Sequence, residues 1–448
     1  MNVVIIGNGI AGTNAVRHIR KRDSDCRIIM VSEETLQPFS RTALMYVYMG
    51  HVRLEDTQLY EPWFWEKNRI ERVLGRVSGV DTAAQKVHLS DGGAIAYDRL
   101  IVASGSKSNK FGWPGQDLKG VSGLYHLQDL EVMEAYSAGL QRAVVVGGGL
   151  IGIEMVEMFL SRGILVTFLV REQSFWDAAL PPEESQMVNR HIREHGVDLR
   201  LGTELQEILS DVQGRARAAL TKTGEEIPCG FVGLTVGVSP NVDFLRDSGI
   251  ALNRGVLVDE YLQTSAPNVY AIGDCAELRN PLPGRRPIEA IWYAGRMMGQ
   301  TVAATVCGQA ERYVPRLWFN SAKFFDIEYQ IYGDVPARTP EGVVSLYWEH
   351  PQGKMAVRIN YREADGAVLG FHLMGVRYRH EVCERWILTQ TPIQTVLENL
   401  ELANFDPEFF RQYEPEIRAL YAARTGVLLR PRTSRSLDRV RAFLRASY

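Results

Sequence analysis

The first residues with chemical meaning form a glycine-rich turn near the amino terminus, Gly7-Asn8-Gly9-Ile10-Ala11-Gly12. An apolar run over residues 3–6 precedes the turn, and a helical pattern over residues 13–20 follows it. In such a turn Gly7 permits the tight bend, Gly9 lets the backbone approach a pyrophosphate, and Gly12 allows close strand–helix packing. Amides at the start of the helix would then bind the phosphates. The pattern predicts a dinucleotide site.

An acidic residue follows the next predicted strand, residues 27–31, where the chain reads Ser32-Glu33-Glu34. A carboxylate about 20 residues beyond the last glycine of the turn is placed to accept hydrogen bonds from ribose hydroxyls. We expect Glu33 to be that carboxylate.

The same arrangement occurs again in mid-chain. A strand is predicted over residues 142–146 and a helix over residues 153–162, and between them lies Gly147-Gly148-Gly149-Leu150-Ile151-Gly152. Gly147, Gly149 and Gly152 occupy the three glycine positions of the pattern. One chain is therefore expected to hold two dinucleotide sites.

The strand after this second turn, residues 165–170, leaves the choice between NADH and NADPH open, with a slight preference for NADH. Its last residue is the apolar Val170, where an NAD site usually carries an acid, and Arg171 and Glu172 follow. Arg171 could neutralise a 2′-phosphate, Glu172 could bind the ribose hydroxyls, or the two could form an exposed pair.

A third motif lies far downstream, where Thr264-Ser265-Ala266-Pro267-Asn268 leads through an apolar strand to Gly273-Asp274. The stretch TSAPNVYAIGDCAE resembles the second flavin motif of the pyridine nucleotide-disulfide oxidoreductase fold. YDRLIVASGS, with Ala103 and Gly105, is similar to that family's linker between its FAD and NAD domains, and VGLTVGVSPN to its return strand. The resemblance implies an FAD site in which Asp274 holds the ribityl chain.

The family's redox cysteines are missing near positions 40–45, where this chain reads Pro38-Phe39-Ser40-Arg41. That segment is similar to oxygenase-coupled ferredoxin reductases, rubredoxin reductases and the flavin module of NADH-dependent nitrite reductases, although Thr42 stands where those relatives have proline. The resemblance implies that Arg41 reaches FAD phosphate. The five cysteines are scattered, with neither a CxxC pair nor zinc-like spacing, so we expect reduced thiols, no thiol relay and no metal site; they are Cys26, Cys229, Cys275, Cys307 and Cys383.

Two further residues take roles from the same resemblance. Trp292 lies in the segment from Ile288 to Gly299, which resembles the reductases' Glu-Ser-Trp helix entry. It is expected to line the flavin face, with packing in a domain interface as the alternative. Glu154 follows the second glycine turn, at the position where relatives place an acid near the nicotinamide.

After about residue 317 the pattern changes to alternating segments, residues 342–348, 354–359 and 367–374, which predict an antiparallel sheet. We therefore expect an α/β protein with two Rossmann-like dinucleotide-binding domains and a C-terminal α+β domain. The aromatic residues of the C-terminal domain could form a dimer interface, or they could form the core of that domain. The expected boundaries are 1–110 and 241–317 for the FAD domain, 111–240 for the NAD(P)H domain, 318–423 for the C-terminal domain, and 424–448 for a tail.

The tail is strongly basic, with seven arginines against the single acid Asp438. A short amphipathic helix over residues 434–447 would suit docking to an acidic electron carrier or partner subunit, or binding to an anionic membrane surface. A solvated chain end is the third possibility.

Bulk properties exclude several classes of protein. A net charge of −3 gives no general affinity for nucleic acid, and no apolar stretch is long enough to span a bilayer. The amino terminus lacks the pattern of a signal peptide, so we expect a cytoplasmic location.

These observations together predict an FAD-dependent NAD(P)H oxidoreductase, a homodimer by resemblance, whose acceptor is a redox protein or partner subunit. The alternatives are a peripheral NADH:quinone reductase, an NADH oxidase without an active cysteine, or a non-enzymatic flavoprotein like apoptosis-inducing factor. The fold alone does not choose among them.

Overall fold

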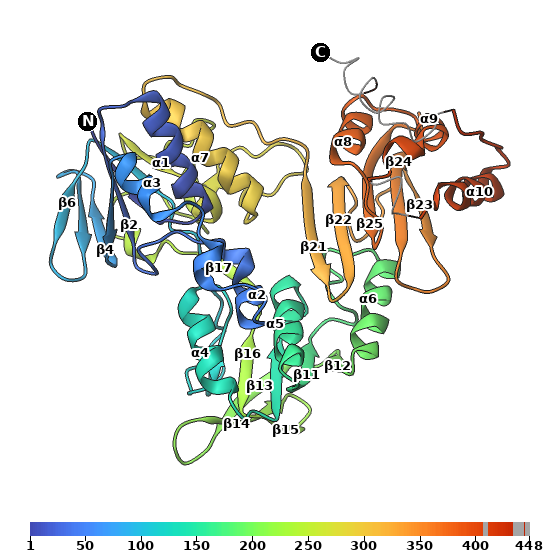
Figure 1. Ribbon diagram of the computed structural model, residues 1–448, viewed down its shortest axis with the longest axis horizontal. Helices are drawn as coiled ribbons and strands as arrows, with labels where there is room; N and C mark the ends of the chain where they lie inside the picture. Colours follow the sequence, from blue (N-terminus) through green and yellow to red (C-terminus); the bar gives the residue numbers. More distant parts are fainter. Residues whose placement is uncertain (406–410, 433–442, 444–448) are drawn as a thin grey trace. The chain divides into compact units, whose positions relative to one another are not determined.

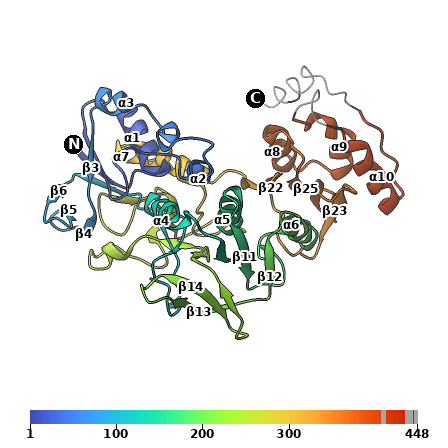
Figure 2. The same ribbon diagram turned by 60° about the horizontal axis from the view of Figure 1, so that its bottom comes forward.

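The computed structural model describes residues 1–405, 411–432 and 443, which form two compact units, each discontinuous in sequence (Figures 1 and 2). Unit 1 contains residues 1–146, 158–165 and 205–315. Unit 2 contains residues 147–157 and 166–204 together with the described residues from 316 onward. The expected domain boundaries therefore stay predictions.

A five-stranded parallel sheet forms the core of unit 1, in the order β19-β7-β1-β2-β3. Strands β1, β2, β7 and β19 are buried on both faces, as parallel strands usually are, whereas the edge strand β3 is partly exposed. Strand β19 lies far downstream in the sequence, yet it pairs with β7 in the same sheet as the first strand of the chain. The bounds are β1 Asn2–Ile6, β2 Arg27–Ser32, β3 Ile70–Leu74, β7 Arg99–Val102 and β19 Val269–Ala271.

Two helices of unit 1, α1 (Ile10–Arg22) and α7 (Trp292–Val306), lie side by side (Figures 1 and 2). They approach closely because Gly299 has no side chain: a Cβ there would lie 2.5 Å from the carbonyl oxygen of Ala11 and 3.0 Å from the amide nitrogen of Ala15. This contact joins the helix after the first glycine turn to a helix nearly 300 residues later.

Unit 1 also contains a shorter parallel array in which β10 (Arg142–Val146) pairs with β16 (Phe231–Leu234), and β16 with β9 (Val121–Ser122). Its remaining helices are α2 Leu44–Tyr48, α3 Pro62–Lys67 and α4 Leu127–Ser137. Its remaining strands form antiparallel meanders and short pairs: β4 Val77–Asp81, β5 Lys86–Leu89, β6 Ala94–Ala96, β8 Ser106–Ser108, β13 Leu205–Ser210, β14 Ala216–Thr221, β15 Glu226–Pro228, β17 Val238–Pro240, β18 Val256–Val258 and β20 Ala276–Leu278.

Unit 2 begins with the second glycine turn and α5 (Leu150–Ser161), whose last turn belongs to unit 1. Strand β11 (Leu165–Val170) pairs in parallel with β12 (Asp198–Leu201), and α6 (Pro182–Glu194) connects them. A strand–helix–strand unit of this kind confirms the Rossmann-like expectation. The helix predicted from residue 153 starts at Leu150 because the end of the glycine turn is itself helical.

The predicted antiparallel sheet is confirmed, with strand order β21-β22-β25-β24-β23. The aromatic residues of β21, β22 and their connection are mostly buried within the chain, with Phe324 at 0% and Tyr329 at 3% exposure, so they form core. Element bounds are β21 Phe319–Phe324, β22 Ile327–Gly333, β23 Val343–Glu349, β24 Ala356–Arg362, β25 Val368–Met374, α8 His380–Leu388, α9 Ile393–Glu398 and α10 Glu414–Thr425.

Nearly all of the basic helix expected over residues 434–447 lies outside the described residues. Among the tail arginines, Arg424 lies in the last turn of α10 and donates a hydrogen bond to the carbonyl oxygen of Ser345. Arg432 forms an ion pair of 2.9 Å with Glu398. No helix in the described part of the chain combines the length and apolar character needed to cross a membrane.

The α1–α7 contact generates a stability prediction. Gly299→Ala is expected to lower the free energy of unfolding by about 1–3 kcal/mol, because the new methyl group would overlap the backbone of α1. Gly295→Ala, in the same helix, is the matched control: its Cβ would lie no closer than 3.4 Å to Ile10, so the helix propensity of alanine should leave stability unchanged or raised. Urea unfolding followed by circular dichroism measures both, and equal effects would contradict the packing argument.

Candidate functional site

The first glycine turn brings the backbone of three segments into direct contact. Gly7 has φ +111°, and a Cβ there would lie 2.1 Å from the carbonyl oxygen of Ala103. A Cβ at Gly12 would lie 2.1 Å from the carbonyl oxygen of Gly7. Gly9 differs, since a Cβ there would meet nothing within 4 Å. Two glycines are thus required by packing, whereas Gly9 faces open space.

That open space lies at the N-terminus of α1. Gly9 is the N-cap residue and offers no side-chain acceptor, and the first turn holds no acidic residue. The amides of the first turn and the positive end of the helix dipole are therefore available to an anion. The residues present fit the pyrophosphate of a dinucleotide.

Asp274 lies in the turn that follows β19 and is held by two hydroxyl groups. Tyr125 donates to its Oδ2 at 3.1 Å and Ser106 at 3.2 Å. Burial raises the pKa of Asp274, which these hydrogen bonds oppose. Gly105 makes room for Tyr125, because a Cβ there would lie 2.9 Å from the phenolic oxygen, and Gly273 begins the turn itself. The carboxylate suits hydroxyl groups such as those of a ribityl chain.

Arg41 lies beside this cluster and is held by Glu34, with two hydrogen bonds of 2.9 and 2.6 Å to its carboxylate oxygens. The guanidinium also donates to the carbonyl oxygen of Tyr125 and lies 4.5 Å from the centre of that ring. Glu34 in turn accepts from the first amide of α4, Leu127, at 2.7 Å. Arg41 is therefore a fixed side chain, and its contact with FAD phosphate stays a prediction.

The pKa of Glu34 is lowered to about 2. Burial alone would raise it, but hydrogen bonds from His126 and Arg41 and the positive charge of Arg41 overcome that effect. Glu34 is thus ionised at neutral pH and fixes Arg41 in place.

Two predicted residues of unit 1 lie apart from this network. The Glu33 side chain is 46% exposed and lies 3.7 Å from Arg76, so its role toward ribose stays a prediction. Trp292 is half-buried as the first residue of α7, in edge contact with Tyr293. Just before it, buried Glu289 accepts two hydrogen bonds from Arg285.

The second glycine turn, in unit 2, repeats the geometry of the first. Gly147 has φ +116° and donates to the carbonyl of Leu169 at 2.9 Å. A Cβ at Gly148 would lie 2.6 Å from Val170 Cγ1, whereas one at Gly149 would meet nothing within 4 Å. Gly152 is buried one turn along. The space at Gly149 again lies at a helix N-terminus and fits a second pyrophosphate.

Arg171 and Glu172 follow β11 as an ion pair of 2.8 Å, with the Arg171 side chain 73% exposed. The exposed-pair alternative is therefore the arrangement present, and it leaves the choice between the two nucleotides open. Either side chain can change partners when a ribose or a 2′-phosphate binds.

Glu154 points from the first turns of α5. Burial, followed by the neighbouring charge of Glu157, raises its pKa to about 7. Glu157 itself pairs with Lys323 at 3.0 Å. A carboxyl group that titrates near neutral pH is a candidate functional group.

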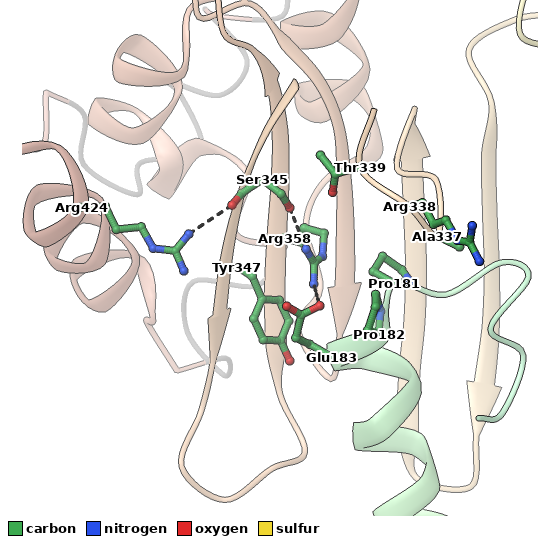
Figure 3. A pocket seen from close by; sticks show the side chains of 10 residues that line it. All are labelled: Pro181, Pro182, Glu183, Ala337, Arg338, Thr339, Ser345, Tyr347, Arg358 and Arg424. Atoms are coloured by element: carbon green, nitrogen blue, oxygen red, sulfur yellow. Dashed lines mark hydrogen bonds and ion pairs between the residues drawn. The ribbon is translucent and has the colours of Figure 1, made fainter. Parts of the chain in front are cut away.

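A polar pocket of about 350 Å³ lies in unit 2 between the start of α6 and the antiparallel sheet (Figure 3). Buried Arg358 projects into it and donates to Glu183, to both oxygens of Glu184, and to Ser345 at 2.7–2.8 Å. His372 lies 3.1 Å from Glu184 on its other side. Glu183 and Glu184 neutralise Arg358, so this network ties α6 to the sheet.

The structure therefore gathers Gly7, Gly9, Gly12, Arg41, Ala103, Gly105, Gly273 and Asp274 in unit 1, and Gly147, Gly149, Gly152, Glu154, Arg171 and Glu172 in unit 2. Four residues of this network were not predicted from the sequence: Glu34, Ser106, Tyr125 and His126. Glu34 carried a signal as the second acid after a predicted strand, and Ser106 as the residue after Gly105 in the linker motif.

Comparison with known proteins gives a family and several relatives. The model of the family described as pyridine nucleotide-disulphide oxidoreductase matches residues 1–305. Rhodocoxin reductase of Rhodococcus erythropolis is 31% identical over 72% of this chain and 76% of its own length. The nitric oxide reductase FlRd-NAD(+) reductase of Salmonella typhimurium is 32% identical over 66% of this chain and 79% of its own. The covalent putidaredoxin reductase–putidaredoxin complex has a similar fold, with a TM-score of 0.77 and 24% identity over 87% of this chain and 93% of the matched chain.

The two open glycines generate a paired prediction. Gly9→Ala should fold, because its φ of −67° suits alanine, but its methyl group would occupy the space of the first pyrophosphate. We expect flavin affinity to fall at least about tenfold, or roughly 1.4 kcal/mol. Gly149→Ala should keep its flavin and instead weaken NAD(P)H binding to a similar degree.

Flavin-to-protein absorbance ratios and nucleotide titrations measure the two effects, with circular dichroism as the control for folding. The assignment of the two sites would be wrong if Gly149→Ala lost flavin while Gly9→Ala retained it.

Proposed function

Because the chain belongs to the pyridine nucleotide-disulphide oxidoreductase family, we propose that it passes electrons from NAD(P)H through FAD to a small redox protein. When bound, FAD accepts a hydride from the nicotinamide and releases electrons to the acceptor. Members of this class are oxidoreductases that use a flavin and a pyridine nucleotide. Our proposal concerns the electron acceptor, the preferred nucleotide and the roles of the individual residues.

The observation that carries the proposal is the state of the five cysteines. No cysteine lies between Cys26 and Cys229, and four of the five are buried with at most 7% exposure. Burial raises the pKa of all of them, including the half-buried Cys307, so none is a ready thiolate. A thiol relay of the kind the family name implies has no residue to use, which favours direct transfer to an external acceptor.

Each glycine turn, with its neighbouring side chains, suits one of the two dinucleotides. The Gly9 turn, Arg41 and Asp274 offer a pyrophosphate site, a fixed cation and a hydroxyl acceptor, which suit FAD. The Gly149 turn and the Arg171–Glu172 pair suit NAD(P)H. A redox-protein acceptor is supported by rhodocoxin reductase, whose name states such a substrate.

We also propose a homodimer, which the resemblance supports, and a cytoplasmic location, which the sequence pattern supports. The basic C-terminal stretch would dock an acidic carrier, by charge complementarity that salt would screen.

Anaerobic stopped-flow spectroscopy tests the proposal. NADH or NADPH should bleach the flavin of the holoprotein rapidly, and a ferredoxin or rubredoxin should reoxidise it faster than a short-chain quinone or oxygen does. Faster reoxidation by quinone or oxygen would favour the reductase or oxidase alternatives, and slow reoxidation by every acceptor the non-enzymatic one.

Treatment of the native holoprotein with iodoacetamide should leave carrier reduction within about twofold of the untreated rate, since the thiols are buried and uninvolved. Mass spectrometry identifies any labelled cysteine. Loss of activity in step with the labelling of one residue would show that a thiol does take part.

Glu154 generates a pH prediction. Since its pKa is about 7, the side chain is mostly neutral at pH 6 and mostly ionised at pH 8. A negative charge beside the nicotinamide would stabilise the positive charge that develops as hydride leaves. We expect the rate of flavin reduction by NADH to rise about three- to tenfold between these pH values, a change of up to roughly 1.4 kcal/mol in the barrier.

Glu154→Gln should abolish that rise, with the rate staying at its low-pH value. Glu157→Gln is the matched control, because removing the neighbouring charge should move the midpoint to lower pH without abolishing it. An unchanged profile in Glu154→Gln would remove Glu154 from the site.

A further inference from the structure

Three potential metal ligands meet at the C-terminal end of α6, all within unit 2. His191 and His195 are four residues apart and so lie on one face of the helix. Asp326 comes from the turn between β21 and β22, whose tip lies beside α6 (Figure 1). One ligand atom from each residue lies within 4.8 Å of the other two.

His191 is the least satisfied of the three. Its side chain is 1% exposed, yet neither ring nitrogen has a hydrogen-bond partner. Nε2 lies against Asp326 Oδ1 in a geometry that is not a hydrogen bond, and Nδ1 lies 3.5 Å from Glu194 Oε2. Buried polar groups are rarely left without hydrogen bonds in folded proteins, and Nε2 of this ring instead faces a carboxylate oxygen that could bind the same metal ion.

His195 is oriented as a ligand would be. Its Nδ1 lies 2.9 Å from the carbonyl oxygen of His191, so the proton resides on Nδ1 and the lone pair on Nε2. Nε2 then lies 3.9 Å from Asp326 Oδ1. The ring stacks on Phe325 with centroids 4.2 Å apart, which fixes its plane.

The turn that supplies Asp326 is also fixed. Phe325 has φ +54°, a strained conformation for a non-glycine residue, and it is 5% exposed against the histidine rings. Asp326 is 60% exposed, which leaves the cluster open to ions from solvent.

We propose that His191, His195 and Asp326 form a binding site for a divalent transition metal, with Zn²⁺ as the expected ion. Two imidazole nitrogens and one carboxylate oxygen are common zinc ligands, and a water molecule completes a tetrahedron. Bonds of about 2.0–2.2 Å place the ligand atoms roughly 3.3–3.6 Å apart, within reach of small side-chain rotations here. The cysteine spacing that led the sequence analysis to expect no metal has no bearing on this histidine pair.

Lys354 is the competing cation, with its ammonium 3.4 Å from Asp326 Oδ2. It contacts Oδ2 of the carboxylate, whereas the two histidines lie near Oδ1. A metal would join the β21–β22 tip to α6, and so would stabilise unit 2.

The test uses the untagged holoprotein, stripped with EDTA and titrated with ZnCl₂. We expect one Zn²⁺ per chain by elemental analysis after gel filtration, and a rise of a few degrees in the thermal midpoint. Asp326→Asn and His195→Gln should each weaken binding at least about tenfold and abolish the thermal shift. His88→Gln, an exposed histidine of β5, should behave as the wild type.

Equal zinc binding by the wild type and both ligand variants would overturn the proposal, as would no binding by any of them. Binding that appears only in Lys354→Gln would also overturn it, by showing that Lys354 is the resident cation. Two ligand variants keep the test valid if one of them fails to fold.

Discussion

The structure of unit 1 depends on backbone atoms that touch where no side chain fits. Gly12 lies against the carbonyl of Gly7, and Gly7 against that of Ala103, at separations that exclude a Cβ. These contacts hold α1 directly over the end of β1 and β7. Gly299 brings α7 against α1 in the same way. The close contacts at Gly7, Gly12 and Gly299, here called the glycine seam, therefore fix the positions of the sheet, both helices and the open N-terminus at Gly9.

The buried charged groups of unit 1 lie around Arg41. Glu34 and Asp274 are two acids near a single arginine, and they respond in opposite ways: the pKa of Glu34 is lowered to about 2, whereas that of Asp274 is raised. Burial alone would raise both, and only Glu34 has direct hydrogen bonds from Arg41 to overcome it. The network therefore fixes one ion pair and leaves Asp274 with hydroxyl partners, which a polyhydroxyl ligand can replace without stranding a charge.

Local patterns in the sequence were enough to predict the strands beside the two glycine turns, the turns themselves, and strands β23, β24 and β25 of the antiparallel sheet. Period, glycine spacing and turn residues are local properties. The partners of Asp274 were not predictable in this way. Tyr125 and Ser106 lie 149 and 168 residues from it, and although Ser106 ends the motif YDRLIVASGS, no local pattern pairs either residue with Asp274. The pairing of Glu34 with Arg41 likewise depends on the folded loop, whereas the role of Glu33 toward ribose stays a prediction.

Helix α6 shows how a polar interior can organise unit 2. Its N-terminal end is held by Arg358, whose guanidinium is neutralised by Glu183 and Glu184 with every contact a charged hydrogen bond. At its C-terminal end the buried imidazole of His191 lies against Asp326 of the β21–β22 turn, with no hydrogen bond to either ring nitrogen. Buried polar groups stabilise a fold only when their partners are complete, so the two ends differ in what they still require. The arginine at the N-terminal end already has its partners, whereas the C-terminal cluster would gain its missing partner from the proposed metal ion between His191, His195 and Asp326.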